Sequence, residues 1–340
     1  MSNYLFRELN ENEDFDPAIL DPSVYFTQAK FYGDWQKDFG REAKRYVIYE
    51  GGTHVGYFQL VKYPLLLGKS YLYSPYGPVL ANFSKGLLAE LKSKIMKIAK
   101  KENAVFVRLD FSPPPDDKTL VESFFKKAKK VTYHAAHFQP RTDWVLPLDK
   151  NEEALLAGMH KATRYSIRFA DKNGIASEII THDFEKYFDT FYNLMVETSI
   201  RDGFSLHPKK YYESIFKNIS KIPNSYLAAA KYQEEVLVIN LIIVYNKSAN
   251  YIFSGSANKY RNLSPSYSAL WAAIRHAKKI GCENFNLGGI SLGETYKGWE
   301  NLSKFKQRFG GRQINHSDFY DVVNMPFWYQ LYNLRRVMKV

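Results

Sequence analysis

The chain has 340 residues, 45% hydrophobic and 24% charged, which is the composition of a globular protein of about two domains. A net charge of +12 and an isoelectric point near 9.3 favour phosphate-rich partners: nucleic acid, a nucleotide-linked substrate or an anionic membrane surface. The single cysteine, Cys282, excludes an intrachain disulfide, and no stretch approaches the ~20 apolar residues of a spanning helix.

The N-terminal segment Met1-Ser2-Asn3-Tyr4 lacks a basic region followed by a long apolar run. We therefore expect no signal peptide and a cytoplasmic location. An aromatic content of 16% is high, and rings serve both cores and binding surfaces.

Strand and helix patterns alternate through the first half. Runs 45–50 and 54–63 flank Gly51-Gly52 and predict a hairpin. Further strands are predicted over 71–80, bent by Pro75 and Gly77-Pro78, over 104–110 and over 133–139. Helices are predicted over 84–101 and, short and basic, over 120–130.

The second half repeats that order. Helices are predicted over 184–201 and 208–220, a hairpin over 225–232 and 236–245, a strand over 250–257, a helix over 266–280 and a strand over 284–287. The two halves share little residue identity, so the repeat is one of topology.

This order is typical of an N-acetyltransferase-like (GNAT) unit, a mixed sheet with helices on both faces. The predicted fold is α/β: two tandem GNAT-like domains, 1–147 and 148–316, with a cleft between them. We expect the C-terminal segment 317–340, whose stretch 326–340 is apolar and basic, to pack back on the first domain.

The loops where a GNAT enzyme binds acyl-coenzyme A are unusual here. Such enzymes cradle the pyrophosphate with backbone N–H groups of a glycine-rich loop at a helix N-terminus. The corresponding segments, 258–265 and 82–84, contain no glycine. This pattern disfavours coenzyme A as the donor.

A basic helix is predicted over 159–170. Its residues His160, Lys161, Arg164 and Arg168 share one face. The face is either a solvated surface or a contact for the phosphates of a tRNA acceptor end.

Lys306 is the strongest catalytic candidate. It lies in Phe305-Lys306-Gln307-Arg308-Phe309-Gly310-Gly311, where a cation stands beside aromatic rings and the glycines predict a flexible turn. If Gly288-Gly289 close the preceding strand, Lys306 can hold a tRNA 3′ end or offset charge on a carbonyl oxygen. The alternative is a surface lysine on an amphipathic helix.

Asp110 is a second catalytic candidate, because carboxylates at strand ends near a cleft are candidate bases. The alternative is an Asp that starts the turn into Pro113. The eight histidines show no metal-ligand spacing, and His134 and His137 would face opposite sides of a strand. No serine nucleophile elbow is present, and we expect neither a metal nor another cofactor.

Several segments together resemble the Fem family of non-ribosomal peptidyltransferases. These enzymes carry an amino acid from aminoacyl-tRNA onto the side-chain amine of a peptidoglycan precursor, forming cell-wall bridges. The likeness runs from about Phe26 to Gly311 and includes Phe138-Gln139-Pro140-Arg141 and the run 164–174 of the basic helix. The best-matching pieces are 28–37, 73–79, 107–110, 139–148, 251–256, 286–290 and 305–311.

The resemblance implies roles for individual residues. The precursor would lie near Lys37, Tyr73 and Asp110, with Tyr211 in the second-domain wall. Phe305 and Lys306 would face the aminoacyl-tRNA end.

The chain also departs from the family pattern. Members that use a nucleotide-linked precursor have an arginine where His207 precedes Pro208, and an aromatic hydroxyl is expected where Phe253 stands. We keep His207 and Phe253 as substrate-binding candidates. About 12 residues separate Arg168 from Thr181, too few for the helical hairpin that some members insert, so this is a compact form.

The resemblance leaves the donated amino acid open. It does not decide whether the acceptor is nucleotide-linked or lipid-linked, or whether it belongs to the cell wall at all. A peripheral membrane contact is a further possibility. The alternative functions are an acyl-coenzyme A N-acyltransferase and a non-catalytic binder of tRNA or other nucleic acid.

Overall fold

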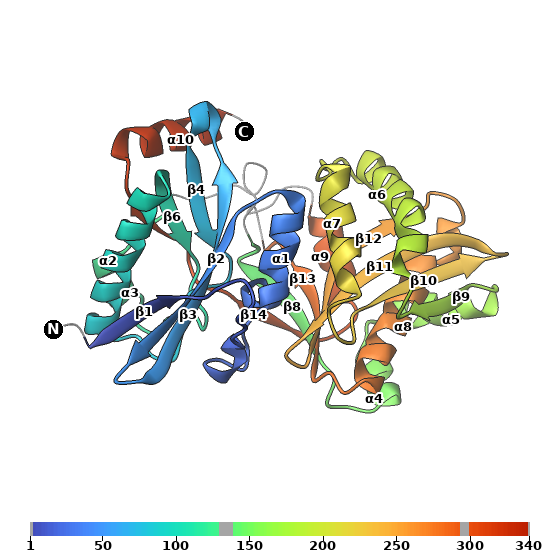
Figure 1. Cartoon of the computed structure of the whole chain (residues 1–340). Helices are drawn as coiled ribbons and strands as arrows, with labels where there is room; N and C mark the ends of the chain where they lie inside the picture. Colours follow the sequence, from blue (N-terminus) through green and yellow to red (C-terminus); the bar gives the residue numbers. More distant parts are fainter. Residues whose placement is uncertain (1–2, 129–138, 293–298, 339–340) are drawn as a thin grey trace. The chain divides into compact units, whose positions relative to one another are not determined.

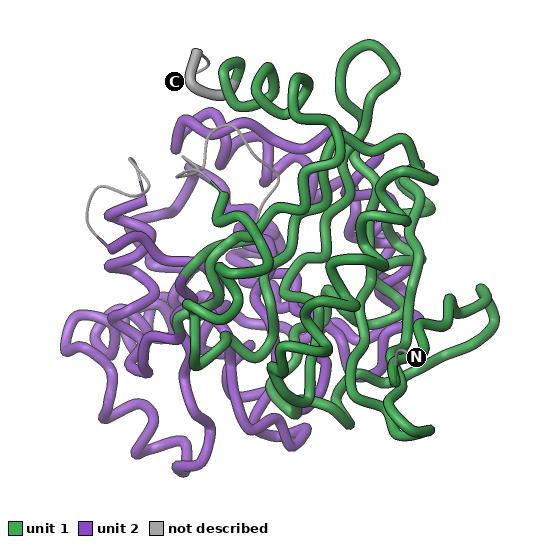
Figure 2. Tube along the Cα trace, turned by 90° about the vertical axis from the view of Figure 1, so that its left-hand side faces the viewer, with its two compact units in different colours: residues 1–141, 293–296, 315–340 green, residues 142–292, 297–314 purple. Residues whose placement is uncertain are grey.

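The structure, a computed structural model, describes residues 3–128, 139–292 and 299–338 (Figure 1). It divides into two compact units. Unit 1 comprises residues 1–141, 293–296 and 315–340, and unit 2 comprises 142–292 and 297–314 (Figure 2). Each unit contains one mixed β-sheet with helices, which confirms the predicted α/β class. The cleft expected between the two halves stays a prediction.

Unit 1 contains a sheet in the strand order β1-β2-β3-β4-β6-β15-β7, with β5 paired to β3. Only the pair β4 and β6 runs parallel among these pairings. Its elements are β1 (Tyr4–Glu8), α1 (Lys30–Phe39), β2 (Ala43–Glu50), β3 (Thr53–Pro64), β4 (Ser70–Ser74), β5 (Val79–Leu80), α2 (Lys85–Lys101), β6 (Ala104–Leu109), α3 (Lys118–Phe124), β7 (Lys126–Lys127), β15 (Tyr320–Val323) and α10 (Pro326–Met338).

The alternation of side chains along β4 and β6 gives the unit 1 sheet two apolar faces. Leu72 and Val107 join the core beneath α2, a helix that Ser84 caps by accepting from the Leu87 amide. Tyr71 and Phe106 point to the other face, where Phe106 packs against Tyr329 of α10. The sheet is therefore buried on both sides in its centre.

A buried ion pair fixes the last strand of the chain to the centre of unit 1. The Arg108 guanidinium donates two hydrogen bonds of 2.7 Å to the Asp321 carboxylate, and both side chains are fully buried. Tyr329 on α10 donates a third bond, of 2.6 Å, to the same carboxylate. Removing one partner of such a pair leaves an uncompensated buried charge, so β15 and α10 depend on Arg108.

Unit 2 contains a sheet in the order β14-β8-β13-β12-β11-β10-β9. Among its described pairings, β12 and β13 are parallel. Its elements are β8 (Thr142–Pro147), α4 (Glu152–Ala157), α5 (Lys161–Lys172), β9 (Ala176–Ile180), α6 (Phe188–Asp202), α7 (Lys209–Ile219), β10 (Tyr226–Tyr232), β11 (Glu235–Tyr245), β12 (Ser248–Ser256), α8 (Pro265–Lys279), β13 (Asn284–Gly289), α9 (Glu300–Gln307) and β14 (Arg312–Asn315).

Helices cover the unit 2 sheet through two separate contacts. The helix α8 packs on β9, β10, β11 and β13 and also contacts α5, while α6 packs on β11 and β12 and contacts α7 (Figure 1). Between α8 and the sheet lies a core that includes Leu270, Ile274, Phe285 and Phe309. A short turn and β9 follow α5 directly, so the helical hairpin that some Fem proteins insert there is missing, as predicted.

Both hairpins and most predicted elements are confirmed, with two corrections. The predicted strand 71–80 is two strands, β4 and β5, separated by a turn in which Tyr76 has a positive φ of 51°. The predicted basic helix 120–130 ends at Phe124, after which β7 pairs with β15. The strand predicted over 133–139 and the His134–His137 pair fall in 129–138, outside the described residues.

Candidate active site

The two parallel strands of unit 2 part before they end. They pair only from Ser248 with Asn284 to Asn250 with Asn286, although β12 continues to Ser256 and β13 to Gly289. The strands beyond the last pair form what we call the fork. Parallel strands that separate in this way expose unpaired backbone groups in the interior of the sheet, where a ligand can meet them.

Lys306 reaches into the fork from α9. Its Nζ donates a 2.7 Å hydrogen bond to the carbonyl oxygen of Gly289, and the side chain is buried. Gly288 has a φ of +76°, and a Cβ placed there would lie 3.6 Å from Lys306 Nζ and 3.4 Å from the Tyr251 carbonyl oxygen of β12. Glycine at 288 therefore leaves the ammonium room at the point where the strands part.

Burial lowers the pKa of the Lys306 ammonium to about 8, and the nearby Asp143 carboxylate opposes this shift. The group is therefore mostly cationic at pH 7 and titrates just above it. A cation held in a water-poor site is well suited to stabilise negative charge that develops on a nearby oxygen.

Asp143 and Asn286 support this part of the fork, and sequence reasoning missed both. Asn286 donates a 2.8 Å bond from its amide to Asp143 and accepts a 2.7 Å bond from the Gly288 amide. This bond holds the backbone at Gly288, beside the Lys306 side chain. Both residues lie in segments that carried the family resemblance, 139–148 and 286–290, but no local pattern marked them as neighbours of Lys306.

Phe305 points away from Lys306, into the unit 2 core. Its ring lies 5.1 Å from Tyr267 and 5.3 Å from Phe309, measured between centroids. Consecutive residues on a helix point in different directions, so one side chain anchors α9 while the other enters the fork. A direct catalytic role for Phe305 stays a prediction, and its contacts are those of a packing residue.

The glycine turn after α9 is tightly packed, so its predicted flexibility is wrong. Gly310 and Gly311 have φ values of +82° and +100°, and a Cβ on Gly311 would lie 2.4 Å from the Val145 carbonyl oxygen of β8. The Trp144 indole donates a 2.6 Å bond to the Gly310 carbonyl. The glycines allow the close approach that fixes the end of α9 to the sheet.

Three further candidates in unit 2 lie together. The His207 ring is 4.3 Å from that of Tyr211 on α7 and 6.3 Å from Phe253 on β12, and Tyr211 is 6.5 Å from Phe253. Tyr212 completes the group, because it packs on Phe253 at 5.2 Å and accepts a bond from the His207 amide. The structure thus brings together the substrate-binding residues predicted for this unit.

The three predicted tRNA contacts on the basic helix α5 differ in how exposed their side chains are. Lys161 and Arg168 are exposed, one near each end of the helix. Arg164 is half-buried and donates to the carbonyl oxygens of Ala157 and Met159 at the end of α4. Lys161 and Arg168 are therefore the cations that a polyanion can reach, whereas Arg164 joins α5 to α4.

The unit 1 candidates Tyr73 and Asp110 form one buried hydrogen-bonded group. The Tyr73 hydroxyl donates to Asp110 at 2.9 Å, and the Tyr76 amide donates to the other carboxylate oxygen at 2.6 Å. Burial raises the pKa of Asp110 well above its usual range, although the bonds from Tyr73, Tyr76 and Gly77 favour its charged form. Asp110 holds the turn at 75–78, and its role as a base stays a prediction.

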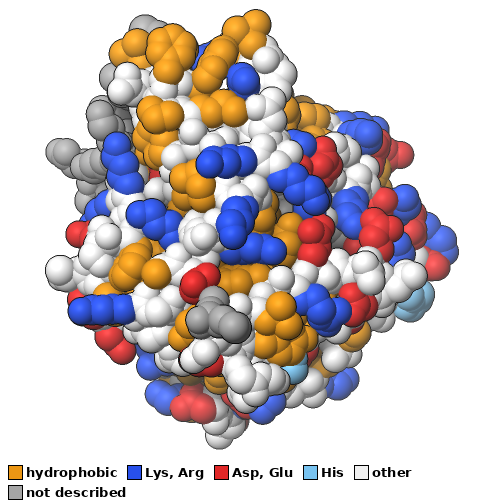
Figure 3. Space-filling view, turned by 60° about the vertical axis from the view of Figure 1, so that its left-hand side comes forward, with side chains coloured by type: hydrophobic (Ala, Val, Ile, Leu, Met, Phe, Trp, Pro, Cys, Tyr) orange, Lys and Arg blue, Asp and Glu red, His pale blue; other side chains and the backbone are white. Residues whose placement is uncertain are grey.

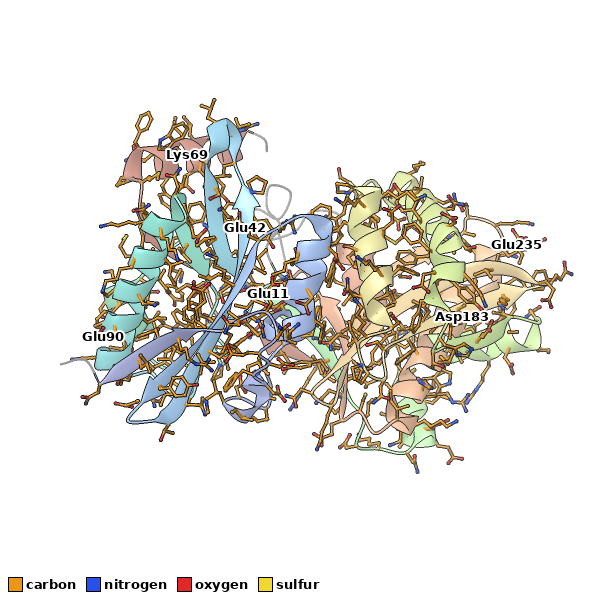
Figure 4. All side chains as sticks on the ribbon, in the orientation of Figure 1. Glu11, Glu42, Lys69, Glu90, Asp183 and Glu235 are labelled. Atoms are coloured by element: carbon orange, nitrogen blue, oxygen red, sulfur yellow. The ribbon has the colours of Figure 1, made fainter. Side chains whose placement is uncertain are left out.

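Lys37 lies on α1 with its side chain half-buried. Its Nζ forms a 2.7 Å ion pair with Glu11, one of the labelled residues in Figure 4. Exposed pairs of this kind contribute little stability, so Lys37 can exchange Glu11 for an anionic ligand at low cost.

The predicted residues therefore fall into two sets. Lys37, Tyr73 and Asp110 lie in unit 1, and the other candidates lie in unit 2. Among the described residues, no group of three or more His, Cys, Asp or Glu side chains is placed to hold a metal ion.

Two mixed sheets in one chain, one of them forked, define the class of tandem GNAT proteins, and solved structures agree. A tandem GNAT protein from the clavulanic acid biosynthesis pathway covers 94% of this chain and 98% of its own, with a TM-score of 0.57 and 12% identity. The structure of FemX covers 96% of this chain and 100% of its own, with a TM-score of 0.80 and 20% identity. These likenesses confirm the predicted fold.

The family follows from the sequence. The model of the FemAB family matches residues 116–236 and 220–336, which together span 221 of the 340 residues, and the chain belongs to this family. It is 24% identical to a lipid II:glycine glycyltransferase of Staphylococcus saprophyticus, over 87% of this chain and 88% of the relative. It is 23% identical to the lipid II:glycine glycyltransferase of Staphylococcus aureus strain USA300, over 94% of this chain and 93% of the relative. The predicted class of enzyme, an aminoacyltransferase, is confirmed.

Proposed function

We propose that the chain transfers an amino acid from aminoacyl-tRNA to the side-chain amine of the stem peptide of a lipid-linked peptidoglycan precursor. The observation that carries the proposal is the buried Lys306 ammonium in the fork of unit 2. The relatives named as lipid II:glycine glycyltransferases support the lipid-linked acceptor and make glycine the first donor to test.

The proposed reaction needs no covalent enzyme intermediate, because the aminoacyl ester is already activated. The acceptor amine attacks the ester carbonyl carbon, a C–N bond forms, and the C–O bond to the tRNA ribose breaks. The amine loses a proton and the leaving ribose oxygen gains one, so the reaction balances. Lys306 offsets the negative charge that develops on the carbonyl oxygen, a contribution of about 3 kcal/mol for one well-placed donor.

The remaining candidates would position the two substrates. Lys161 and Arg168 are the exposed cations that would meet tRNA phosphates on α5. His207, Tyr211 and Phe253 would contact the precursor in unit 2. Lys37 and Tyr73 would do so in unit 1, with Asp110 the candidate for accepting the proton of the amine.

The proposal is tested by measuring transfer of radiolabelled glycine from charged tRNA. Two acceptors are compared: the lipid-linked pentapeptide precursor and its nucleotide-linked counterpart. We expect label on the lipid-linked acceptor, lost when the donor is treated with RNase. If glycyl-tRNA labels neither acceptor, the assay is repeated with the other charged tRNAs. Failure with all of them overturns the proposal. Transfer from an acyl-coenzyme A would also overturn it.

A matched pair of variants on α9 tests the role of Lys306. Lys306→Met removes the buried cation, and Lys304→Met removes an exposed cation two residues earlier on the same helix. We expect kcat to fall roughly 100- to 1000-fold in Lys306→Met and to stay within about twofold in Lys304→Met. Equal rates for the two folded variants would remove Lys306 from the mechanism.

A further inference from the structure

Unit 1 exposes hydrophobic side chains at one end. The turn between β3 and β4 is Pro64-Leu65-Leu66-Leu67-Gly68-Lys69, in which Leu66 and Leu67 are 61% and 82% exposed. Leu67 also adopts a left-handed conformation, with φ 55°, which is costly for leucine. An exposed turn normally carries Gly, Asn, Asp or Ser, so these leucines serve neither the turn nor the core.

The C-terminal helix α10 exposes a second apolar set. Phe327, Leu331 and Leu334 follow the helical spacing i, i+4, i+7 and are 67%, 41% and 58% exposed. The opposite face of α10 is used for packing, where Tyr329 and Tyr332 contact Phe106. The helix is therefore apolar on its outer side as well as on its inner side.

These two sets lie side by side. Lys69 at the end of the turn places its Nζ 5.4 Å from the centre of the Trp328 ring on α10, and the start of β4 contacts α10 through Tyr71 and Tyr332 at 5.9 Å. Figure 4 labels Lys69 next to α10. Figure 3 shows hydrophobic side chains gathered at the top of one face, the level at which Figure 1 places α10 and the turn. We call Leu66, Leu67, Phe327, Leu331 and Leu334 the apolar end.

The charged side chains in the described parts of the two segments that form the apolar end are of one sign. The turn 64–69 and residues 324–335 contain no Asp or Glu, but they contain Lys69 and Arg335. Lys126 is exposed and lies 5.5 Å from the ring of Tyr329 at the inner side of the helix. Apolar side chains bordered by cations, with Trp328 among them, match the surface of an anionic bilayer.

We propose that the apolar end is a docking site for an anionic phospholipid membrane, into which Leu66, Leu67 and the outer side of α10 insert. This docking would be peripheral, since no helix among the described residues has the length and apolar character needed to cross a bilayer. The proposal deepens the proposed function, on which it rests for its purpose: an enzyme that modifies a lipid-linked precursor must work at the membrane.

Binding to vesicles tests the proposal without any transfer reaction. The full chain is sedimented with vesicles of phosphatidylcholine alone and of equal parts phosphatidylcholine and phosphatidylglycerol, with no peptidoglycan precursor present. We expect binding to the anionic vesicles that weakens as salt is added. Absence of binding to both vesicles would overturn the proposal.

A matched pair of double variants locates the surface. Leu67→Asn with Leu331→Gln alters the apolar end, and asparagine tolerates the backbone conformation at 67. Leu5→Gln with Ile19→Gln alters two exposed apolar residues elsewhere in unit 1, which are 62% and 66% exposed, against 82% and 41% for Leu67 and Leu331. We expect the partition coefficient to fall at least about tenfold in the first and to change less than about twofold in the second.

The outcomes separate docking from catalysis. Equal vesicle binding by the two double variants would overturn the proposal. So would a change in oligomeric state confined to the first variant with no vesicle binding, because a second copy would then cover the apolar end. A chain that binds vesicles through the apolar end but transfers no amino acid keeps this inference and loses the proposed function. Transfer to a nucleotide-linked acceptor, where it is measurable, should be equal in both double variants.

Discussion

The sheets of the two units have the same strand arrangement, but they differ at their parallel strand pair. Counted from β1 in unit 1 and from β9 in unit 2, each sheet begins with four antiparallel strands. The fifth strand is parallel to the fourth, and the sixth is antiparallel to the fifth. In unit 1 the parallel pair β4 and β6 stays together to Ser74 and Leu109, the last residue of each strand. In unit 2 the pair β12 and β13 separates after three residue pairs. One topology thus gives a closed sheet and a forked one.

The buried ionisable groups follow this difference. The closed sheet of unit 1 ends in Asp110, whose carboxylate accepts bonds from its own unit and fixes a turn. The forked sheet of unit 2 admits Lys306, whose ammonium has one hydrogen bond to a backbone carbonyl among its described contacts. We infer that the fork, rather than the GNAT topology as such, makes room for chemistry.

The largest expected effect is on the free energy of unfolding, when a tightly packed glycine of unit 2 and an open glycine of unit 1 are each replaced by alanine. Gly311→Ala would place a Cβ 2.4 Å from the Val145 carbonyl, while Gly52→Ala in the β2–β3 turn meets nothing within 4 Å; both have positive φ. We expect the free energy of unfolding to fall by roughly 3 to 4 kcal/mol in the first and by about 1 kcal/mol in the second. Urea denaturation measures both, and equal losses would show that α9 is held loosely.

A second prediction concerns the cost of burying Lys306. Its pKa is about 8 in the folded chain and ordinary, 10.5, in the unfolded chain, so between these values only the unfolded chain holds the proton. The unfolding free energy of the native chain should therefore rise with pH over this window, by up to about 3 kcal/mol. Lys306→Met should lack that rise. Urea unfolding at pH 7 and pH 10 tests this, and parallel pH dependence in both proteins would contradict a depressed pKa.

A third prediction separates Asp143 from Asp110 by the effect of each on activity. Asp143 raises the pKa of Lys306, so Asp143→Asn should lower that pKa further. If the cation is required, the decline of kcat/KM at alkaline pH should move to lower pH. Asp110→Asn should leave the position of that decline unchanged. An unshifted profile in Asp143→Asn would show that Lys306 acts without this carboxylate.

The smallest expected effect is that of Asp110→Asn on how the free energy of unfolding depends on pH. Burial raises its folded pKa, so as pH rises above about 4 the unfolded chain loses its proton first and the free energy of unfolding falls. Asp110→Asn should remove this fall, so its stability relative to that of the native chain should increase from pH 4 to pH 8. Thermal unfolding across this range is the measurement. A relative stability that stays flat with pH would indicate a carboxylate that its three donors keep charged.

Local patterns predicted the parts of the fold that depend on neighbours in sequence. Gly51-Gly52 marked the first hairpin because both glycines take positive φ, and the apolar spacing of 84–101 marked α2. The strands β8 and β15 are short and pair with segments far away in the chain, β15 with β6 more than 200 residues earlier. No local periodicity specifies such a pairing, so neither strand was predicted.

The site was predictable in part for the same reason. Lys306 was found through its motif, and the motif also explains why Phe305 and Phe309 anchor α9. The fork could not be predicted, because it depends on where two strands stop pairing and on the backbone of Gly288.

The route of the chain through unit 1 has a consequence for biosynthesis. Unit 1 is built mainly from residues 1–141 and 315–340, so the residues of unit 2 lie between two parts of unit 1 in the sequence. On the ribosome, Arg108 emerges long before Asp321, the carboxylate that will neutralise it. Since domains generally fold as units during synthesis, unit 2 can finish folding while the first-made strands still wait for β15. A segment translated after unit 2 therefore completes unit 1.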